Sequence, residues 1–269
     1  MKREQFCDHW MFGKTGEKMV SVTLPHDATQ YEIRQPDAAS GSGGAYYPGG
    51  SYIYEKAFTA PEDWKEKTVL VEFEGVYPCA QVFLNGKEIG AESYGYNLFR
   101  VELTEILYGQ ENTLRVEADN SRVPNSRWYA GAGIYRPVWL LTGNREHILP
   151  DGVRITTLSY EPAQIMVEVE TSAARGTKQE STEILTVICD PGGKAVLSEE
   201  LTMQDGKYTA VLDIPDAQLW DDENPNLYTC EISLCREGVC LDSASTVFGI
   251  RKLKWSTEGF LINGKSVLL

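Results

Sequence analysis

The chain has 269 residues, of which 42% are hydrophobic and 24% are charged, the proportions of an ordinary soluble globular protein. Its formal net charge of −14 argues against nucleic acids and anionic membrane surfaces as partners, because both are negatively charged. No apolar run approaches the roughly 18 residues that a membrane helix needs, and the N-terminal MKREQFCDHW lacks the apolar segment of a signal peptide.

The first half of the chain predicts a set of antiparallel strands, because short β-rich segments recur about every 8–12 residues and end at Gly, Pro, Asn or Asp. Asn85-Gly86 lies between alternating apolar residues and predicts a hairpin with a type I′ turn across residues 80–90. Residues 38–50, AASGSGGAYYPGG, predict a loop. We therefore expect a jelly-roll β-sandwich over residues 1–146. Its other expected strands are residues 20–24, 51–58, 68–73, 98–103, 112–118 and 134–141.

The second half predicts another all-β domain. Six or seven strands in about 100 residues match an immunoglobulin-like β-sandwich over residues 147–250, although no cysteine pair around a core tryptophan marks a true immunoglobulin domain. The tail, residues 251–269, holds one more expected hairpin at Asn263-Gly264 and stops within an apolar pattern. We therefore expect the protein to be longer than this chain. The expected strands of the sandwich are residues 152–158, 164–171, 183–189, 207–212, 227–234 and 244–248.

Motifs for independent chemistry are weak. Residues 259–266, GFLINGKS, match GxxxxGK[ST], but the loop interior is strand-like and no helix follows, so a hairpin is expected and not a nucleotide site. The three histidines are far apart, without HExxH or GxSxG, and His26 is expected to fix a turn. The acidic residues 221–223 are expected in a solvated turn, because adjacent carboxylates in a turn point apart.

The six cysteines do not form a recognisable metal or disulfide pattern. Cys230, Cys235 and Cys240 recur every five residues, a spacing that fits neither CxxC nor a zinc ribbon. The chain is also too large to need disulfides for its stability. We infer a reducing compartment and expect a cytoplasmic protein.

Aromatic residues in polar, glycine-rich surroundings are the most informative class. Pyranose rings stack on such side chains while nearby Asn, Arg and Asp side chains bind the hydroxyl groups. The alternative is that several of these rings cap the end of the sandwich core. The residues in question are Tyr46, Tyr47, Tyr94, Tyr96, Trp128 and Tyr129.

The segment NSRWYAGAGIYRPVWL, residues 125–140, resembles the end of the sugar-binding jelly roll of glycoside hydrolase family 2, the β-galactosidase and β-glucuronidase family. The segment YPGGSYIYEK is more similar to the galactosidases of the family than to its glucuronidases. The β-glucuronidase and β-mannosidase members stay open as alternatives. Other segments agree in the family's order: LPHDA at 24–28 with SGGAYYPGGSYIYEKAF at 42–58, VFLNGKEIG at 82–90, LWDDENPNLYTCEI at 219–232, and FGIRKLKWSTEGFLINGKSVLL at 248–269.

This resemblance implies the N-terminal, non-catalytic part of a retaining β-glycosidase that hydrolyses terminal β-galactosides in the intact protein. The catalytic glutamates of the family lie on a (β/α)₈ barrel, which residues 251–269 would begin, so no catalytic residue is assigned here and this chain is expected to be inactive. A homo-oligomer is expected for the intact enzyme. The sequence assigns no cofactor or metal, and a structural or active-site cation, divalent or monovalent, is left open for the intact enzyme.

The resemblance also implies site residues. In the family's β-galactosidases the loop before the GIYR-type strand reaches the barrel mouth and supplies a polar side chain to the sugar. The family's bacterial prototype has an acidic residue there, whereas this sequence has none between Asp119 and Asp151. Gly131, Gly133 and Arg136 are interpreted as structural, the glycines for a kink and the arginine as a buried partner across the sheets. The implied substrate-binding residues are Asn125, Ser126, Arg127, Trp128 and Tyr129.

Two other classes of function stay open. One is a stand-alone carbohydrate-binding protein, and the other is a structural two-sandwich protein such as an adhesin. The glycosidase interpretation expects sugar binding by this chain alone to be too weak to detect, since half of the substrate pocket would be missing.

Overall fold

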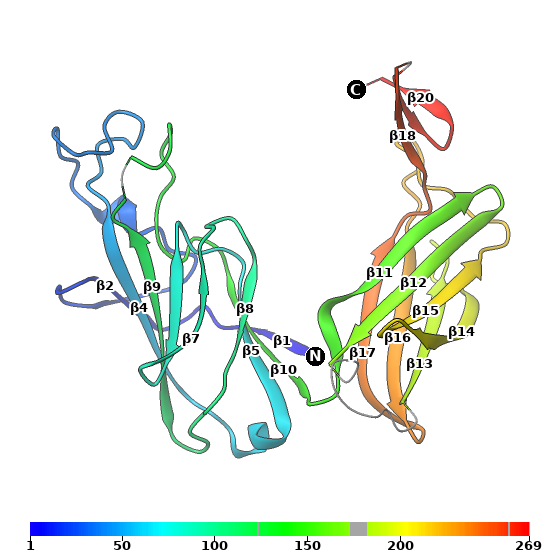
Figure 1. The fold of residues 1–269 in the computed structure, drawn as a ribbon, viewed down its shortest axis with the longest axis horizontal. Helices are drawn as coiled ribbons and strands as arrows, with labels where there is room; N and C mark the ends of the chain where they lie inside the picture. The colour runs from blue at the N-terminus through cyan, green and yellow to red at the C-terminus, as the bar shows by residue number, and fades with distance from the viewer. Residues whose placement is uncertain (123, 173–181, 258, 269) are drawn as a thin grey trace. The chain divides into compact units, whose positions relative to one another are not determined.

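The fold is that of a computed structural model, which describes residues 1–122, 124–172, 182–257 and 259–268. The chain forms two compact units, Lys2–Thr142 and Gly143–Leu269, the second of which also includes Met1 (Figure 1). Their regular structure is almost entirely β-strand, which confirms the all-β prediction. Among the described residues, no helix has the length and apolar character needed to cross a membrane.

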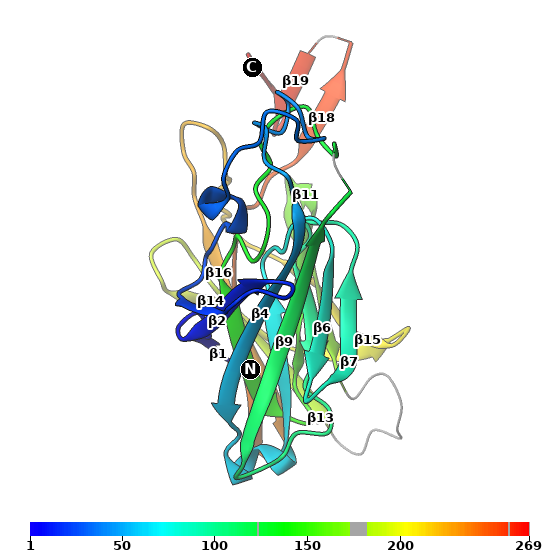
Figure 2. The same ribbon diagram turned by 90° about the vertical axis from the view of Figure 1, so that its left-hand side faces the viewer.

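The first unit is a two-sheet sandwich built mainly from antiparallel strand pairs, and this confirms the jelly-roll-like prediction. The larger sheet has the order β3-β2-β4-β9-β6-β7, of which β2, β4, β9, β6 and β7 are labelled in Figure 2, and the smaller has the order β1-β10-β5-β8 (Figure 1). The strands are β1 (Lys2–Gln5), β2 (Trp10–Lys14), β3 (Val20–Val22), β4 (Gly50–Thr59), β5 (Lys67–Phe73), β6 (Ala80–Leu84), β7 (Lys87–Glu92), β8 (Phe99–Glu102), β9 (Glu111–Asn120) and β10 (Val138–Asn144), with the 3₁₀ helices η1 (Ala28–Tyr31) and η2 (Glu62–Glu66).

The centre of the larger sheet is the pair β4 and β9, which stay in register over ten residues, from Gly50 opposite Asn120 to Thr59 opposite Glu111. Alternate side chains of a strand point to opposite faces, so one face can be apolar throughout. Tyr54 on β4 and its partner Val116 on β9 are both fully buried. This pair therefore fixes the position of the loops at the ends of both strands.

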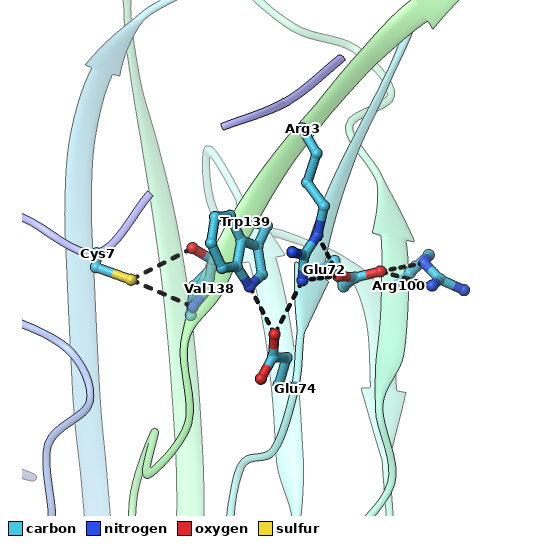
Figure 3. A network of polar contacts seen from close by, with 7 residues as sticks. All are labelled: Arg3, Cys7, Glu72, Glu74, Arg100, Val138 and Trp139. Atoms are coloured by element: carbon cyan, nitrogen blue, oxygen red, sulfur yellow. Dashed lines mark hydrogen bonds and ion pairs between the residues drawn. The ribbon is translucent and has the colours of Figure 1, made fainter. Parts of the chain in front are cut away.

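The smaller sheet is joined by a buried ion-pair network around Glu72 of β5, which is only 3% exposed (Figure 3). Its Oε1 accepts hydrogen bonds from Nε (3.0 Å) and Nη2 (2.8 Å) of Arg3, and its Oε2 accepts one from Nε of Arg100 (2.6 Å). Glu74 accepts from Arg3 and from the indole of Trp139. The network thus connects all four strands of this sheet, and losing either arginine would leave the buried Glu72 with one guanidinium partner in place of two.

The second unit has a separate apolar core built from alternating strand residues such as Ile165, Val167 and Ile232. A seven-stranded arrangement has the order β11-β12-β15-β14-β13-β16-β17, and a small sheet has the order β18-β19-β20. The strands are β11 (Ile148–Tyr160), β12 (Ala163–Thr171), β13 (Thr182–Cys189), β14 (Ala195–Gln204), β15 (Lys207–Asp213), β16 (Tyr228–Arg236), β17 (Val239–Phe248), β18 (Leu253–Ser256), β19 (Gly259–Ile262) and β20 (Lys265–Val267).

Both predicted Asn-Gly hairpins are confirmed. Asn85 and Gly86 have φ values of 50° and 84° between β6 and β7, and Asn263 and Gly264 have 48° and 80° between β19 and β20. Two consecutive residues with positive φ define the type I′ turn. The GxxxxGK[ST] match is therefore a hairpin, as predicted. Leu269, at the end of the predicted apolar pattern, lies outside the described residues.

Four of the described strands were not predicted from the sequence, and one expected strand begins later. The unpredicted strands β1, β2, β14 and β18 are short or largely exposed; β14 has one buried residue in ten, so it lacks the alternation that identifies a strand. The strand expected from residue 134 begins at Val138. Pro137 precedes it, and proline has no N–H to donate to a neighbouring strand.

The interpretation of Arg136 as a buried residue is wrong. The side chain is exposed, and its guanidinium carbon lies 5.3 Å from the ring centroid of the adjacent Tyr135. Arg136 immediately precedes Pro137, before the ladder of β10 begins, so the alternation of the strand does not reach it.

Candidate functional site

The loop between β9 and β10 carries the predicted site residues, and Asp27 holds it in place. Oδ1 of Asp27 accepts hydrogen bonds from N (3.0 Å) and Oγ1 (2.9 Å) of Thr29 and from N of Ala132 (3.0 Å). Oδ2 accepts a hydrogen bond from the hydroxyl of Tyr129. One carboxylate therefore caps the 3₁₀ helix η1 and fixes a loop more than 100 residues away in the sequence.

The two glycines of this loop have the structural role that was predicted. Gly131 and Gly133 have φ values of 67° and 95°, which side-chain-bearing residues rarely adopt. A Cβ at Gly131 would lie 2.8 Å from Oδ2 of Asp27, and one at Gly133 would overlap the hydroxyl of Tyr54. Both positions therefore need glycine, because the chain passes directly over another side chain.

His26 does not fix the turn as predicted, since Asp27 does so. His26 is 7% exposed, its Nδ1 shares a hydrogen bond of 2.9 Å with the hydroxyl of Tyr54, and its ring stacks on Tyr31. Burial lowers the pKa of His26, while the neighbouring Asp27 acts in the opposite direction. His26 is therefore part of the packed base beneath the loop.

The structure places four of the five predicted residues along one open groove of about 590 Å³. These four are Asn125, Ser126, Arg127 and Trp128. The fifth, Tyr129, turns toward Asp27 beside a space of only about 30 Å³, which holds about one water molecule and no sugar. The groove is in the size range of small-molecule sites, whereas the space beside Tyr129 is not.

Within the groove, the polar groups differ in their availability. Nδ2 of Asn125 donates to Oδ1 of Asn120 (2.5 Å), and the hydroxyl of Ser126 donates to the carbonyl of Trp128. The side chain of Arg127 is exposed and makes no ion pair with a described residue. Trp128 is 64% exposed. Arg127 and Trp128 are therefore the side chains most open to a ligand.

The groove has a second wall, which the sequence analysis did not assign to the site. Two further loops contribute it: the one before β6 and the one between β7 and β8. Tyr94 and Tyr96 had been noted as aromatic residues in polar surroundings, whereas Tyr77 had not. Their convergence has no local signal, because it depends on the order of the strands. The residues of this wall are Tyr77, Pro78, Ser93, Tyr94, Gly95 and Tyr96.

The described residues contain no group of three or more His, Cys, Asp or Glu side chains that could hold a metal ion. The acidic residues 221–223 lie in a turn, as expected, where Oδ1 of Asp221 accepts from N of Glu223 (3.1 Å) and N of Asn224 (2.6 Å). They form no carboxylate pair across a cleft.

Comparison with known families gives two adjoining matches. Residues 147–251 match the family described as glycosyl hydrolases family 2, and residues 45–133 match the glycosyl hydrolase 2 galactose-binding domain-like family. The chain belongs to glycosyl hydrolase family 2. The second match includes residues 125–129 and both walls of the groove, so the predicted site lies in the galactose-binding-like domain of the family.

Curated relatives include a putative β-glucuronidase of Formosa agariphila and β-galactosidase BoGH2A of Bacteroides ovatus. They are 32% and 35% identical over 252 and 253 residues, which are 92% and 91% of this chain. The chain spans only 24% and 30% of their lengths, a quarter to a third.

Solved structures of glycosidases have a similar fold over nearly the whole of this chain. A family 2 member from Bacteroides cellulosilyticus superposes with a TM-score of 0.87 at 28% identity, covering 99% of this chain and 37% of that one. A β-glycosidase from Bacteroides vulgatus gives 0.86 at 30% identity, covering 99% and 36%.

Proposed function

We propose that this chain is the non-catalytic N-terminal part of a retaining β-glycosidase, in which Asn125–Trp128 form one wall of the substrate pocket. The main observation in support is that these residues line an open groove in the domain that matches the galactose-binding-like family. Asp27 and the two glycines fix the shape of the loop. This supports the proposed role, because a binding loop gains affinity when its shape is already set.

A β-galactoside is the proposed substrate, and a β-glucuronide is the second candidate. The sequence style of residues 47–56 supports the galactoside, while the name of the Formosa relative supports the glucuronide. The catalytic carboxylates are proposed to lie on a barrel outside the described residues, which contain two β-units and no alternating strands and helices.

The test measures hydrolysis by the longer protein and by the 269-residue chain, with 4-nitrophenyl β-galactoside and β-glucuronide. We expect the longer protein to release the sugar first as its β-anomer, observed by proton NMR, since a retaining mechanism passes through a glycosyl-enzyme intermediate. We expect no turnover by the 269-residue chain. Release of the α-anomer, or turnover by the short chain, would contradict the proposal.

A further inference from the structure

The groove on the first unit contains more aromatic surface than a wall for one sugar ring needs. Tyr94, Tyr96 and Trp128 are 59%, 45% and 64% exposed, and all three line the same groove. Large aromatic side chains normally bury most of their surface, so three exposed rings along one concave surface indicate a binding site.

The rings contact one another edge-on or at a tilt. Tyr96 makes such contacts with Tyr77 (centroids 5.5 Å apart, planes at 63°), Tyr94 (5.6 Å, 58°) and Tyr135 (6.4 Å, 75°). These contacts orient Tyr96 while 45% of its surface stays exposed, and the apolar C–H face of a pyranose can pack on an exposed aromatic ring.

The loop that carries Tyr94 and Tyr96 is fixed before any ligand arrives. The hydroxyl of Tyr135 donates to the carbonyl of Gly95 (2.9 Å), and a carboxylate oxygen of Glu92 accepts from N of Tyr94 (2.9 Å). A Cβ on Gly95 would lie 2.5 Å from the ring of Tyr77, so this loop packs closely on its neighbour. Binding would therefore lose little conformational entropy.

The charge of the groove also suits a saccharide. Arg127 is the single charged residue among those that line it, although the chain has 39 acidic residues. The other polar groups are amides and hydroxyls, which bind sugar hydroxyls as both donors and acceptors. Such a lining admits neutral sugars and, through Arg127, acidic sugars as well.

We propose that this aromatic groove binds a saccharide of several rings, the part of the substrate beyond the sugar that is cleaved, and does so without the catalytic domain. The ligand class rests on the proposed function. Because Tyr77, Tyr94 and Tyr96 line the same groove as Trp128 within one unit, detectable binding no longer requires another domain. This differs from the sequence-based expectation of undetectable binding by the chain alone.

The test is titration of the 269-residue chain, followed by protein NMR, with galactose, a β-1,4-linked galactotetraose and a glucuronate-terminated disaccharide. We expect the tetrasaccharide to bind at least about tenfold more tightly than galactose, because several rings fill the groove. Equal affinity for galactose and the tetrasaccharide, or no binding of any probe, would overturn the proposal.

Two variants and one control locate the binding. Trp128→Ala and Tyr94→Ala should each weaken tetrasaccharide binding about five- to tenfold, since each removes a large aromatic contact. The control Trp255→Ala removes an aromatic residue that is 70% exposed and does not line the groove, and it should leave binding unchanged. Tetrasaccharide binding that survives both groove variants would overturn the assignment of the site.

Failure of this inference and failure of the proposed function give different results. If the longer protein hydrolyses a β-glycoside with retention while the groove variants bind the tetrasaccharide normally, the function stands and the groove assignment falls. If the groove binds saccharides but the longer protein hydrolyses no β-glycoside, the groove assignment stands and the proposed function falls.

Discussion

Asp27 is the side chain on which the shape of the β9–β10 loop depends. Its Oδ1 accepts hydrogen bonds from N and Oγ1 of Thr29 and from N of Ala132, and its Oδ2 accepts one from the hydroxyl of Tyr129. These bonds hold the loop that carries the predicted site residues. Asp27 is a positioning residue.

We expect Asp27→Ala to lower the free energy of unfolding by about 2–4 kcal/mol, because it removes a helix cap and several charge-assisted hydrogen bonds. Urea unfolding followed by tryptophan fluorescence measures this, since four of the six tryptophans lie in the first unit. Asp119→Ala is the matched control: Oδ1 of Asp119 accepts from N of Ser121 in an exposed turn, so its loss should cost under about 1 kcal/mol. Equal effects of both substitutions would contradict the central role of Asp27.

The second prediction concerns His26. Burial lowers the pKa of His26, so the folded chain keeps it neutral at pH values where the unfolded chain, with an ordinary pKa of 6.5, already binds a proton. Protons that bind preferentially to the unfolded state reduce stability as the pH falls. The destabilisation caused by His26 is therefore absent well above pH 6.5 and grows as the pH falls below that value.

We expect His26→Asn to be destabilised at pH 7 and to lose less further stability than the unmodified chain between pH 7 and pH 5. The measurement is the urea midpoint of both chains at pH 7, 6 and 5, and the decisive quantity is the difference between them. A difference that stays constant over this range would contradict a lowered pKa for His26.

The β16–β17 hairpin brings two cysteines together that the five-residue spacing had not paired. Cys235 lies opposite Cys240, next to a turn in which Glu237 and Gly238 have φ values of 49° and 77°. All six cysteines are free thiols. Burial and then the neighbouring thiol of Cys240 raise the pKa of Cys235. Opposed residues of an antiparallel pair are about 4.5–5.5 Å apart at Cα, within the range that a disulfide spans.

We therefore expect a mild thiol oxidant such as diamide to join Cys235 to Cys240, with loss of two hydrogens and reduction of the diazene. The oxidised chain should be about 1–2 kcal/mol more stable, near the low end for disulfides because the closed loop is short. Mass spectrometry and thiol counting would find four free thiols in place of six. Cys235→Ser should abolish the reaction, whereas Cys79→Ser, at an exposed cysteine elsewhere, should preserve it.

The division of the chain into two units rests on two separate apolar cores. The sequence pattern predicts a boundary after Glu146, whereas the compact units meet between Thr142 and Gly143, within β10. Only residues 145–147 separate β10 from β11, so no Pro- or Gly-rich linker marks the change. The expectation that residues 251–269 begin a catalytic barrel stays a prediction.

The sequence by itself determined the local elements. Asn-Gly pairs with positive φ produced both hairpins, and alternating apolar residues identified β4, β9 and most strands of the second unit, because each signal is contained within a few neighbouring residues. The family motif near residue 128 likewise pointed to one of the three loops that line the candidate groove. Cytoplasmic location and oligomeric state stay predictions.

Only the tertiary structure decided which side chains meet. It separated Tyr129 from the groove by pairing it with Asp27, exposed Arg136, and brought Tyr77, Tyr94 and Trp128 together from three loops. These contacts join residues far apart in the chain, and strand order and register set them. Neither a periodic apolar pattern nor a single sequence motif specifies contacts between residues so far apart in the chain.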